Sequence, residues 1–250
     1  MTLIIILAES GLEIIPKQIR NHPAVTKNVI KRNFSSQLLD SALHHAAMPK
    51  LANHEKRGRP DIAHSCILNA LGSPANKSGH LKLFLHTVQD RIFEINPEIR
   101  ISRNYNRFKG LMTKLLIEGD IIADKSPLIT EIHHRLSELI HSFRNPQVFL
   151  FSSRGKLFAN KTDLFLNPKT QNYIAIVGGF QKGGFSDQIL NLSENFISIS
   201  QYSLDAWIVI SRIITHYEIM GLSFFSGFDD LLFCRILLTK CDIFSNRARE

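Results

Sequence analysis

Four segments of this 250-residue chain carry side chains whose type and spacing could do chemistry, and the most strongly charged of them is residues 100–109. It holds four cations and no carboxylate: Arg100, Arg103, Arg107 and Lys109. If a helix begins near Ser102, Arg103 and Arg107 share a face at i and i+4, where like charges repel by roughly 0.2–0.5 kcal/mol. An anionic ligand would offset this repulsion, and Tyr105 and Phe108 could stack on the bases of single-stranded RNA. Alternatively, the arginines form a solvated run of charge. For Phe108 the alternative is packing in the core, which is favoured over stacking on a base.

A second segment is the basic loop Lys56-Arg57-Gly58-Arg59-Pro60-Asp61, which runs into a helix predicted over Ile62–Leu71. Asp61 stands where an N-cap is expected, and Gly72 stands where a C′ glycine would end the helix. Alternatively, the carboxylate of Asp61 orients Arg59 toward a phosphate of a ligand. The sequence leaves both roles open.

The third and fourth segments follow predicted strands. Gly178-Gly179-Phe180-Gln181-Lys182-Gly183-Gly184 matches neither the P-loop nor the G-x-G-x-x-G pattern, although its glycines permit positive φ and close approach to a ligand. A tight turn would need the same residues. In the fourth segment, Phe196–Ser200 is a predicted strand, Ser203 the predicted cap of the next helix and Asp205 part of its first turn. Open α/β sheets bind ligands at such strand ends.

Alternating elements position these segments. Strands are predicted at Leu3–Ala8, Leu81–His86, Arg91–Ile95, Val148–Ser152, Tyr173–Val177 and Phe196–Ser200. Helices are predicted at Ser35–Met48, Leu128–Phe143 and Trp207–Tyr217, and a loop around Asp124–Pro127. This alternation predicts an α/β fold with a mainly parallel sheet. The short link between Leu81–His86 and Arg91–Ile95 predicts an antiparallel hairpin, which we interpret as part of an insertion.

Composition and charge narrow the class of protein. With 44% hydrophobic and 21% charged residues, the chain is typical of a folded globular protein. The net charge is +8, and counting along the sequence places 16 Lys and Arg against 8 Asp and Glu in residues 1–110, but 14 against 14 in residues 111–250. The whole excess therefore lies in the first 110 residues, which favours a basic face that meets a polyanion such as nucleic acid.

Membrane, disulfide and metal classes are disfavoured. The apolar run Leu3–Ala8 is far shorter than the roughly 20 residues that span a bilayer. The three cysteines Cys66, Cys234 and Cys241 have neither disulfide-framework nor zinc spacing, so we expect a reducing, cytoplasmic setting. Adjacent histidines, His44-His45 and His133-His134, point to different sides of a helix, and no metal site is predicted.

Several motifs occur in a characteristic order between residue 3 and about residue 218. They are Leu7-Ala8-Glu9-Ser10, Leu38-Leu39-Asp40-Ser41, the basic loop, Asn69-Ala70-Leu71-Gly72-Ser73-Pro74, Glu94-Ile95-Asn96-Pro97 with the arginines after it, Gly178-Gly179-Phe180, Ser198-Ile199-Ser200, Ala206-Trp207 and Ser211-Arg212. In this order they resemble the Nep1 (Emg1) family, the SPOUT-class methyltransferases that modify N1 of pseudouridine in small-subunit ribosomal RNA. The sequence of residues 104–108 is more similar to archaeal members of the family than to eukaryotic ones.

The resemblance implies a SPOUT-type fold with a C-terminal trefoil knot, S-adenosylmethionine as cofactor, and a homodimer. By position, the cofactor would be lined by Gly178, Gly183, Ser198, Ile199, Ser200, Gln201, Tyr202, Ser203 and Leu204. RNA would be contacted by Arg59, Arg100, Arg103 and Arg107, with Asp61 orienting Arg59. Asp40 is a candidate acceptor for a proton from the base. Alternatively, Asp40 is a polar residue on a helix without a catalytic role.

The implied activity is methylation of N1 of a pseudouridine in small-subunit rRNA, contributing to ribosome biogenesis. The alternative is a non-catalytic RNA-binding factor of ribosome assembly. The implied methyltransferase domain spans residues 1–220, with an RNA-binding insertion at roughly 50–110, and residues 221–250 form an apolar extension. The sequence departs from the family pattern at Gln181–Gly184, where many archaeal relatives have a Pro-His-Gly-Asp-like turn. Lys182 in this loop must face solvent, because a cation would repel a sulfonium.

Overall fold

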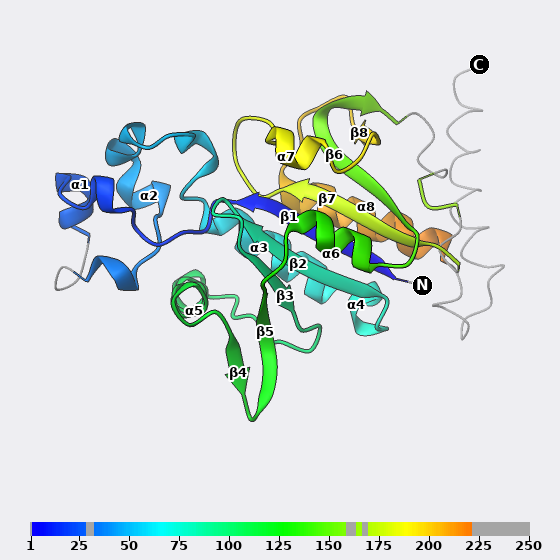
Figure 1. Ribbon diagram of the computed structural model, residues 1–250, viewed down its shortest axis with the longest axis horizontal. Coiled ribbons are helices and arrows are strands. Elements are labelled where there is room, and N and C mark those ends of the chain that lie inside the picture. Colours follow the sequence, from blue (N-terminus) through cyan, green and yellow to red (C-terminus); the bar gives the residue numbers. More distant parts are fainter. Residues whose placement is uncertain (1, 29–32, 159–163, 167–169, 222–250) are drawn as a thin grey trace, which may run out of the picture.

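An eight-stranded sheet organises the protein in a computed structural model that describes residues 2–28, 33–158, 164–166 and 170–221. The strands, in the order β4-β5-β3-β2-β1-β7-β6-β8, form one sheet (Figure 1). Their bounds are β1 Leu3–Ser10, β2 Leu81–Thr87, β3 Ile92–Ile95, β4 Ile121–Ala123, β5 Ser126–Ile132, β6 Pro146–Leu157, β7 Asn172–Gly178 and β8 Phe196–Ser198. The five strands β2, β1, β7, β6 and β8 are parallel, and the pairs among β2, β3, β5 and β4 are antiparallel. The predicted α/β fold is confirmed, but the sheet is mixed: four of its seven described strand pairs are parallel and three are antiparallel.

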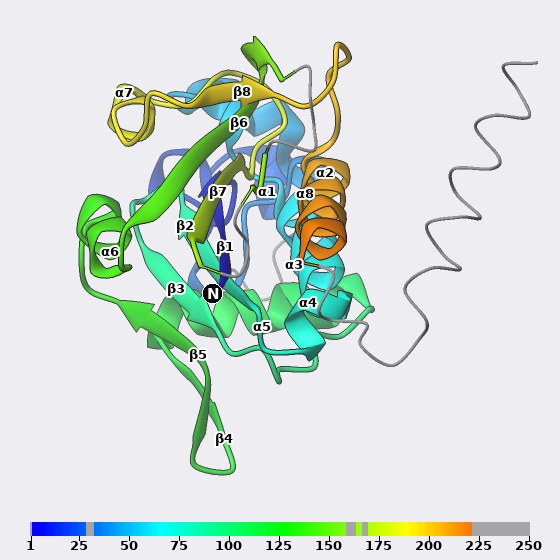
Figure 2. The same cartoon turned by 90° about the vertical axis from the view of Figure 1, so that its right-hand side faces the viewer.

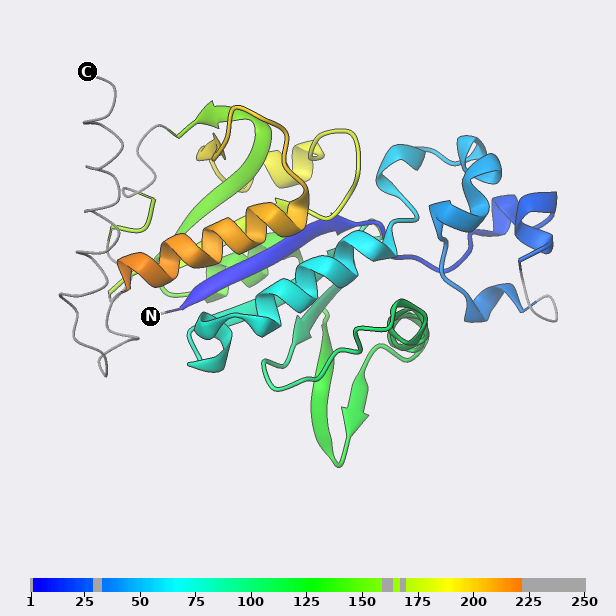
Figure 3. The same cartoon turned by 180° about the vertical axis from the view of Figure 1, so that it is seen from behind.

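Helices cover both faces of this sheet. Their bounds are α1 Pro23–Thr26, α2 Ser41–His44, α3 Pro60–Gly72, α4 Pro74–Lys77, α5 Tyr105–Glu118, α6 Leu136–Ser142, α7 Asp187–Leu190 and α8 Ala206–Met220. Figure 2 shows α6 and α7 on one side of the sheet and α3 and α8 on the other, and Figure 3 shows α3 and α8 side by side. The segment with α1 and α2 extends beyond the sheet (Figure 1).

The alternation of side chains along β1 explains the two layers. Leu3, Ile5 and Leu7 pack toward α3 and α8, whereas Ile4 and Ile6 pack toward α6. All eight residues of β1 are buried, as expected for a central parallel strand that is covered on both faces. A smaller apolar cluster that includes Ile15, Leu39 and Met48 stabilises the segment with α1 and α2.

Two long helices predicted from periodicity are wrong. Residues 35–48 form a 3-10 turn at Phe34–Ser36, α2, and a 3-10 helix at His45–Lys50. The backbone of Asp40 is extended, at φ −136° and ψ 115°, and its carboxylate caps α2, which interrupts any longer helix. In Leu128–Phe143, the first part belongs to β5, where Ile129 pairs with Ile95 of β3, and the helix α6 begins only at Leu136. Cross-strand pairing thus overrides a helical pattern.

Other boundaries move by a few residues. The antiparallel hairpin is confirmed, since Leu83 pairs with Ile95, although its second strand begins at Ile92. The predicted loop near residue 124 is the turn between β4 and β5, with φ of 49° at Asp124 and 64° at Lys125, but Pro127 already lies in β5. Gly72 is the last residue of α3 rather than a residue beyond it, and Ser73 follows as C-cap.

The domain boundaries remain predictions. Residues 50–110 contribute α3, β2 and β3 to the packed core as well as the beginning of α5. The predicted apolar extension at 221–250 lies, apart from Gly221, outside the described residues. In the described part of the chain, no helix is long and apolar enough to cross a membrane.

Candidate cofactor pocket and basic face

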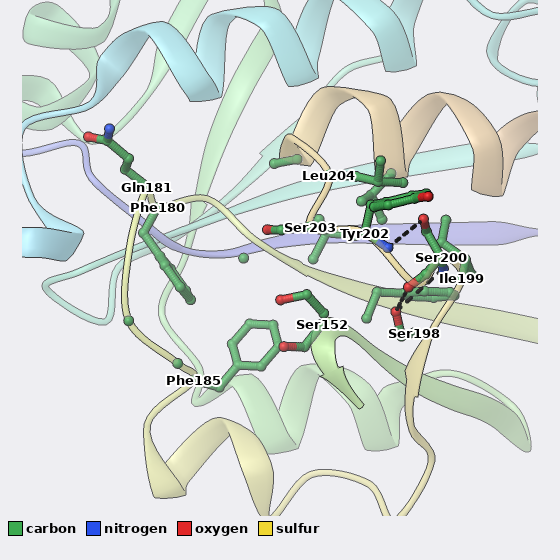
Figure 4. A pocket seen from close by; sticks show the side chains of 18 residues that line it. Ser152, Phe180, Gln181, Phe185, Ser198, Ile199, Ser200, Tyr202, Ser203 and Leu204 are labelled. Carbon is green, nitrogen blue, oxygen red and sulfur yellow. Dashed lines mark hydrogen bonds between the residues drawn. The ribbon is translucent and has the colours of Figure 1, made fainter. Parts of the chain in front are cut away.

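A pocket lies where the parallel strands β7 and β8 end, beside residues 151–153 of the neighbouring strand β6. Its walls are the loop after β7 and the loop after β8, and the first residues of α8 close it (Figure 4). The lining residues are Phe151, Ser152, Ser153, Val177, Gly178, Phe180, Gln181, Gly183, Gly184, Phe185, Ser198, Ile199, Ser200, Tyr202, Ser203, Leu204, Ala206 and Val209. This is the edge at which open α/β sheets bind ligands.

The loop after β8 is shaped by its own serines. Ser198 Oγ donates to the carbonyl oxygen of Ser200 at 2.7 Å, and the backbone N–H of Tyr202 donates to Ser200 Oγ at 3.0 Å (Figure 4). This turn ends β8 at Ser198, two residues earlier than predicted. The helix α8 then begins at Ala206 with Asp205 at its N-cap position, so the predicted cap at Ser203 is wrong.

The loop after β7, residues 178–186, is named here the glycine-rich loop. Gly183 has a φ of +100°, which only glycine adopts without strain. Phe180 and Phe185 pack edge to face with their ring centroids 5.7 Å apart, and both rings point into the pocket (Figure 4). The loop therefore supplies apolar walls and close backbone, and Lys182 is exposed and does not line the pocket.

The chemistry of the lining fits S-adenosylmethionine. None of the lining side chains is charged, so neither a cation for a phosphate group nor a carboxylate projects from the lining itself, although Lys56 and Arg154 lie next to the lining residues Phe180 and Gly184. Aromatic and aliphatic side chains can cover an adenine ring, while serine hydroxyls and backbone groups can bind polar atoms. Within the described residues there is also no group of three or more His, Cys, Asp or Glu side chains that could hold a metal ion.

The structure brings eight of the nine predicted cofactor residues to this pocket. They are Gly178, Gly183, Ser198, Ile199, Ser200, Tyr202, Ser203 and Leu204, whereas Gln201 is exposed and does not line it. Sequence reasoning missed the middle of β6, where Phe151, Ser152 and Ser153 form part of the wall. The strand end predicted at Ser152 could have indicated them, because open α/β sheets bind ligands beside strand ends, although in the structure β6 continues to Leu157. Contact of all these residues with the cofactor stays a prediction.

The basic loop holds a paired arginine. Arg59 Nε donates to Asp61 Oδ1 at 2.8 Å, and Nη2 donates to Oδ2 at 2.6 Å. Burial by itself raises the pKa of Asp61, but the hydrogen bonds and charge of Arg59 outweigh it and hold the pKa below its ordinary value. Because α3 begins at Pro60, Asp61 lies in the first turn and is not the N-cap. The carboxylate of Asp61 therefore holds Arg59 in place, and the orientation of Arg59 toward a phosphate of a ligand stays a prediction.

The arginines of residues 100–109 face solvent. Arg100, Arg103 and Arg107 are exposed, and in the described part of the chain no carboxylate pairs with their side chains. The helix α5 begins at Tyr105 with Asn104 as its cap, so Arg103 precedes it and the predicted i, i+4 pair with Arg107 does not form. Phe108 is fully buried and stacks on His64 at 4.3 Å, which confirms its core role.

Asp40 lies apart from the pocket lining. Its Oδ1 accepts from the Ala42 backbone at 3.0 Å, and its Oδ2 accepts from Lys109 Nζ at 3.0 Å and from Tyr105 Oη at 3.1 Å. The residue is 4% exposed, and the Nζ of Lys109 also lies 4.7 Å from the centroid of the Tyr105 ring. These contacts are those of a helix cap and a buried ion pair. A role of Asp40 as proton acceptor stays a prediction.

The fold and the pocket define an α/β protein with a pocket of uncharged side chains beside the ends of parallel strands and, apart from it, an arginine-rich face, by which we mean the exposed Arg100, Arg103 and Arg107. The family model described as EMG1/NEP1 methyltransferase matches residues 5–218. The chain belongs to this family, as its motifs indicated.

Individual relatives agree with this assignment. The chain is 42% identical over 218 residues to a protein of Staphylothermus marinus named ribosomal RNA small subunit methyltransferase Nep1, covering 86% of this chain and 94% of the relative. A Thermococcus kodakarensis protein of the same name is 38% identical over 86% of this chain and 96% of the relative. The crystal structure of Archaeoglobus fulgidus Nep1 bound to S-adenosylhomocysteine matches with a TM-score of 0.78 and 35% identity, covering 89% of this chain and all of that one.

Proposed function

We propose that this protein is an rRNA methyltransferase that transfers the methyl group of S-adenosylmethionine to N1 of a pseudouridine in small-subunit ribosomal RNA, contributing to ribosome biogenesis. The observation that carries the proposal is the uncharged pocket between the glycine-rich loop and residues 198–206. It lies in a chain whose relatives are named small-subunit rRNA methyltransferases, one of them crystallised with the demethylated cofactor.

In this proposal, the residues of the chain bind the cofactor and the RNA and orient the two reacting groups. Bound S-adenosylmethionine supplies a methyl group on a sulfonium, which is already a strong electrophile. The aromatic rings of Phe180 and Phe185 exclude water from one wall, and the turn at Ser198–Tyr202 fixes the other. Positioning of the two reactants supplies much of the rate in this proposal, because aligned reactants avoid the entropy cost of encounter. The proton on N1 must leave as the methyl group arrives, and Asp40 is its candidate acceptor.

The arginine-rich face would hold the RNA. Arg100, Arg103 and Arg107 present exposed cations, while Arg59 is held in one orientation by Asp61. Such cations bind phosphates without reading sequence, and a looped-out nucleotide could then reach the pocket. The helix α3 begins beside Arg59 and the helix α8 begins beside the pocket, and the two helices lie side by side (Figure 3), which supports a short path between this face and the pocket.

Three finer features belong to the same proposal. We expect a trefoil knot near the C-terminus, which the strand order β7-β6-β8 and the return of the chain into α8 support. We expect a homodimer, supported by the exposed apolar side chains Tyr202, Ile208 and Ile219 beside the pocket and along α8. We also expect the protein to act in the cytoplasm, where its rRNA substrate would be found.

One experiment separates this function from its rival. Calorimetry with S-adenosylmethionine tests the pocket, and incubation with two RNA hairpins that differ only in pseudouridine or uridine at one position tests the chemistry. Transfer to the pseudouridine hairpin alone is expected. Methyl transfer to neither RNA, with RNA binding retained, would contradict the proposal and favour the non-catalytic assembly factor.

A further inference from the structure

Glu9, near the end of β1, adopts a backbone conformation that is unusual for its residue type. Its φ is +50°, in the left-handed region, and its side chain is buried. Its backbone N–H donates to His86 Nδ1 at 3.1 Å, which fixes this conformation. Non-glycine residues held in this region cluster at functional sites. The proposed function gives Glu9 no role, although it lies in the Leu7-Ala8-Glu9-Ser10 motif.

The carboxylate of Glu9 joins two loops that are distant in sequence. Oε1 accepts the backbone N–H of Ser186, the last residue of the glycine-rich loop, at 3.2 Å. Oε2 accepts from Nζ of Lys56, in the basic loop, at 2.8 Å. The two side chains are 11% and 15% exposed, so water screens this ion pair only weakly.

Lys56 also contacts the glycine-rich loop directly. Its Nζ lies 5.0 Å from the centroid of the Phe180 ring, a cation–π distance, and Phe180 packs on Phe185. Its Cε would lie 3.4 Å from a Cβ at Gly183, so the aliphatic stem passes against the turn of the loop. Lys56 therefore holds the pocket wall from behind, although it does not line the pocket itself.

From these contacts we propose that Glu9 and Lys56 are positioning residues for the cofactor: their ion pair holds the glycine-rich loop in the conformation that binds S-adenosylmethionine. The inference rests on the proposed function, since it assigns the loop to that cofactor. Without the pair, the N–H of Ser186 loses its acceptor, and the ring of Phe180 loses the ammonium of Lys56 and keeps its contact with Phe185. The loop would then have to be ordered when the cofactor binds, which weakens binding.

The same basic loop supplies a matched control. Arg57 donates to Glu13 from Nε at 2.6 Å and from Nη2 at 2.5 Å, and Glu13 is fully buried. This pair also ties the basic loop to the chain after β1, but none of its described contacts reaches the glycine-rich loop. Loss of either pair removes a buried ion pair, whereas only loss of the Lys56 pair releases the pocket wall.

The test compares Lys56→Met, Lys56→Arg and Arg57→Met in the full chain, with S-adenosylhomocysteine as the calorimetric probe. Lys56→Met is expected to raise its Kd, and the KM for S-adenosylmethionine, by about tenfold, with kcat at saturating cofactor within about twofold of wild type. Lys56→Arg keeps the charge and the ring interaction and is expected to restore the Kd to within about threefold. Arg57→Met is expected to lower Tm at least as much as Lys56→Met, with an unchanged Kd.

A second variant covers the case in which Lys56→Met does not fold. Glu9→Gln keeps an oxygen for Ser186 but removes the charge that binds Lys56, so the Kd for S-adenosylhomocysteine should also rise.

Equal Kd changes in Lys56→Met and Arg57→Met would overturn the inference, because the effect would then be general destabilisation. A raised KM for RNA with an unchanged Kd for the cofactor would also overturn it and assign Lys56 to RNA binding. If the wild-type protein does not bind S-adenosylhomocysteine, the proposed function itself fails. If the wild-type protein binds it and transfers methyl groups, and the variants have the wild-type Kd, only this inference fails.

Discussion

Two buried histidines accept backbone hydrogen bonds at Nδ1, and both must stay neutral to do so. His44 accepts the N–H of Asp40 at 3.0 Å, and His86 accepts the N–H of Glu9 at 3.1 Å. Burial lowers the pKa of both rings below the ordinary 6.5, and the nearby carboxylates Asp40 and Asp90 only partly offset it. Each ring therefore fixes the backbone beside a carboxylate that takes part in an ion pair.

The sign of the resulting pH dependence follows from proton uptake. Below pH 6.5 the unfolded chain binds protons at these histidines that the folded chain resists, so the free energy of unfolding falls from there down to the folded pKa. We expect Tm to fall as the pH is lowered through and below the unfolded-state pKa of about 6.5. His44→Asn, whose amide oxygen can replace Nδ1, should flatten this dependence, whereas the same change at the exposed neighbour His45 should not. Identical pH profiles for the two variants would contradict the assignment.

At the same scale, the exposed arginines of residues 100–109 lead to a prediction about RNA binding. Arg103→Ala or Arg107→Ala should weaken RNA binding and flatten the plot of log K against log salt by roughly 0.7 for each phosphate that the variant no longer neutralises. Cofactor affinity should not change, because neither residue lines the pocket. The exposed Arg144, which lies outside the basic segment, provides the control variant Arg144→Ala. A slope that is unchanged by all three substitutions would mean that residues 103 and 107 face solvent in the complex.

At the scale of elements, the contact between β6 and β8 holds one wall of the pocket. The register of this pair shifts between Phe151 and Lys156, so that both residues pair with Ile197. Gly155 lies in the shifted stretch, and a Cβ there would lie 2.5–2.7 Å from the backbone of Ile197. Any side chain at this position must therefore move β8, and with it the turn that begins at Ser198.

Gly155→Ala should accordingly destabilise the protein by about 1–3 kcal/mol, the usual cost of overpacking, and weaken cofactor binding. Gly110→Ala is the matched control, because nothing lies within 4 Å of its Cβ position in the helix α5. That substitution should stabilise the protein by about 0.5–1 kcal/mol through helix propensity. Thermal unfolding and calorimetry measure both effects, and a Gly155→Ala protein with wild-type Tm and Kd would contradict the close packing.

At the scale of the whole molecule, the proposed dimer requires an apolar surface. Ile208 and Ile219 are 38% and 54% exposed and lie about three helical turns apart on one face of α8. Sedimentation should give twice the mass of one chain, and Ile208→Glu should shift the population toward monomer, because a buried unpaired charge is costly. Ile122→Glu is the control, since Ile122 is 60% exposed on the β4–β5 hairpin away from α8. A monomer at all concentrations would contradict the dimer.

The sequence by itself determined the features that depend on local pattern and composition. The apolar run Leu3–Ala8 specified a buried central strand, and a short link between two apolar runs specified the hairpin of β2 and β3. The excess of cations in residues 1–110 and the ordered motifs pointed to RNA and to the family. Eight of the nine residues that the resemblance assigns to the cofactor line one pocket, and they fall in two short segments after strands.

Only the tertiary structure decided what depends on partners far along the chain. Pairing with β3 made a helical pattern at Ile129 into a strand, and the capping role of Asp40 broke a predicted helix. The pair Glu9 and Lys56 is separated by 47 positions, and the contact of Glu9 with Ser186 spans 177. No local periodicity encodes such contacts, because they arise when loops from different strands meet at one edge of the sheet. The edge of the sheet, rather than any single motif, therefore brings the cofactor pocket and the basic loop together.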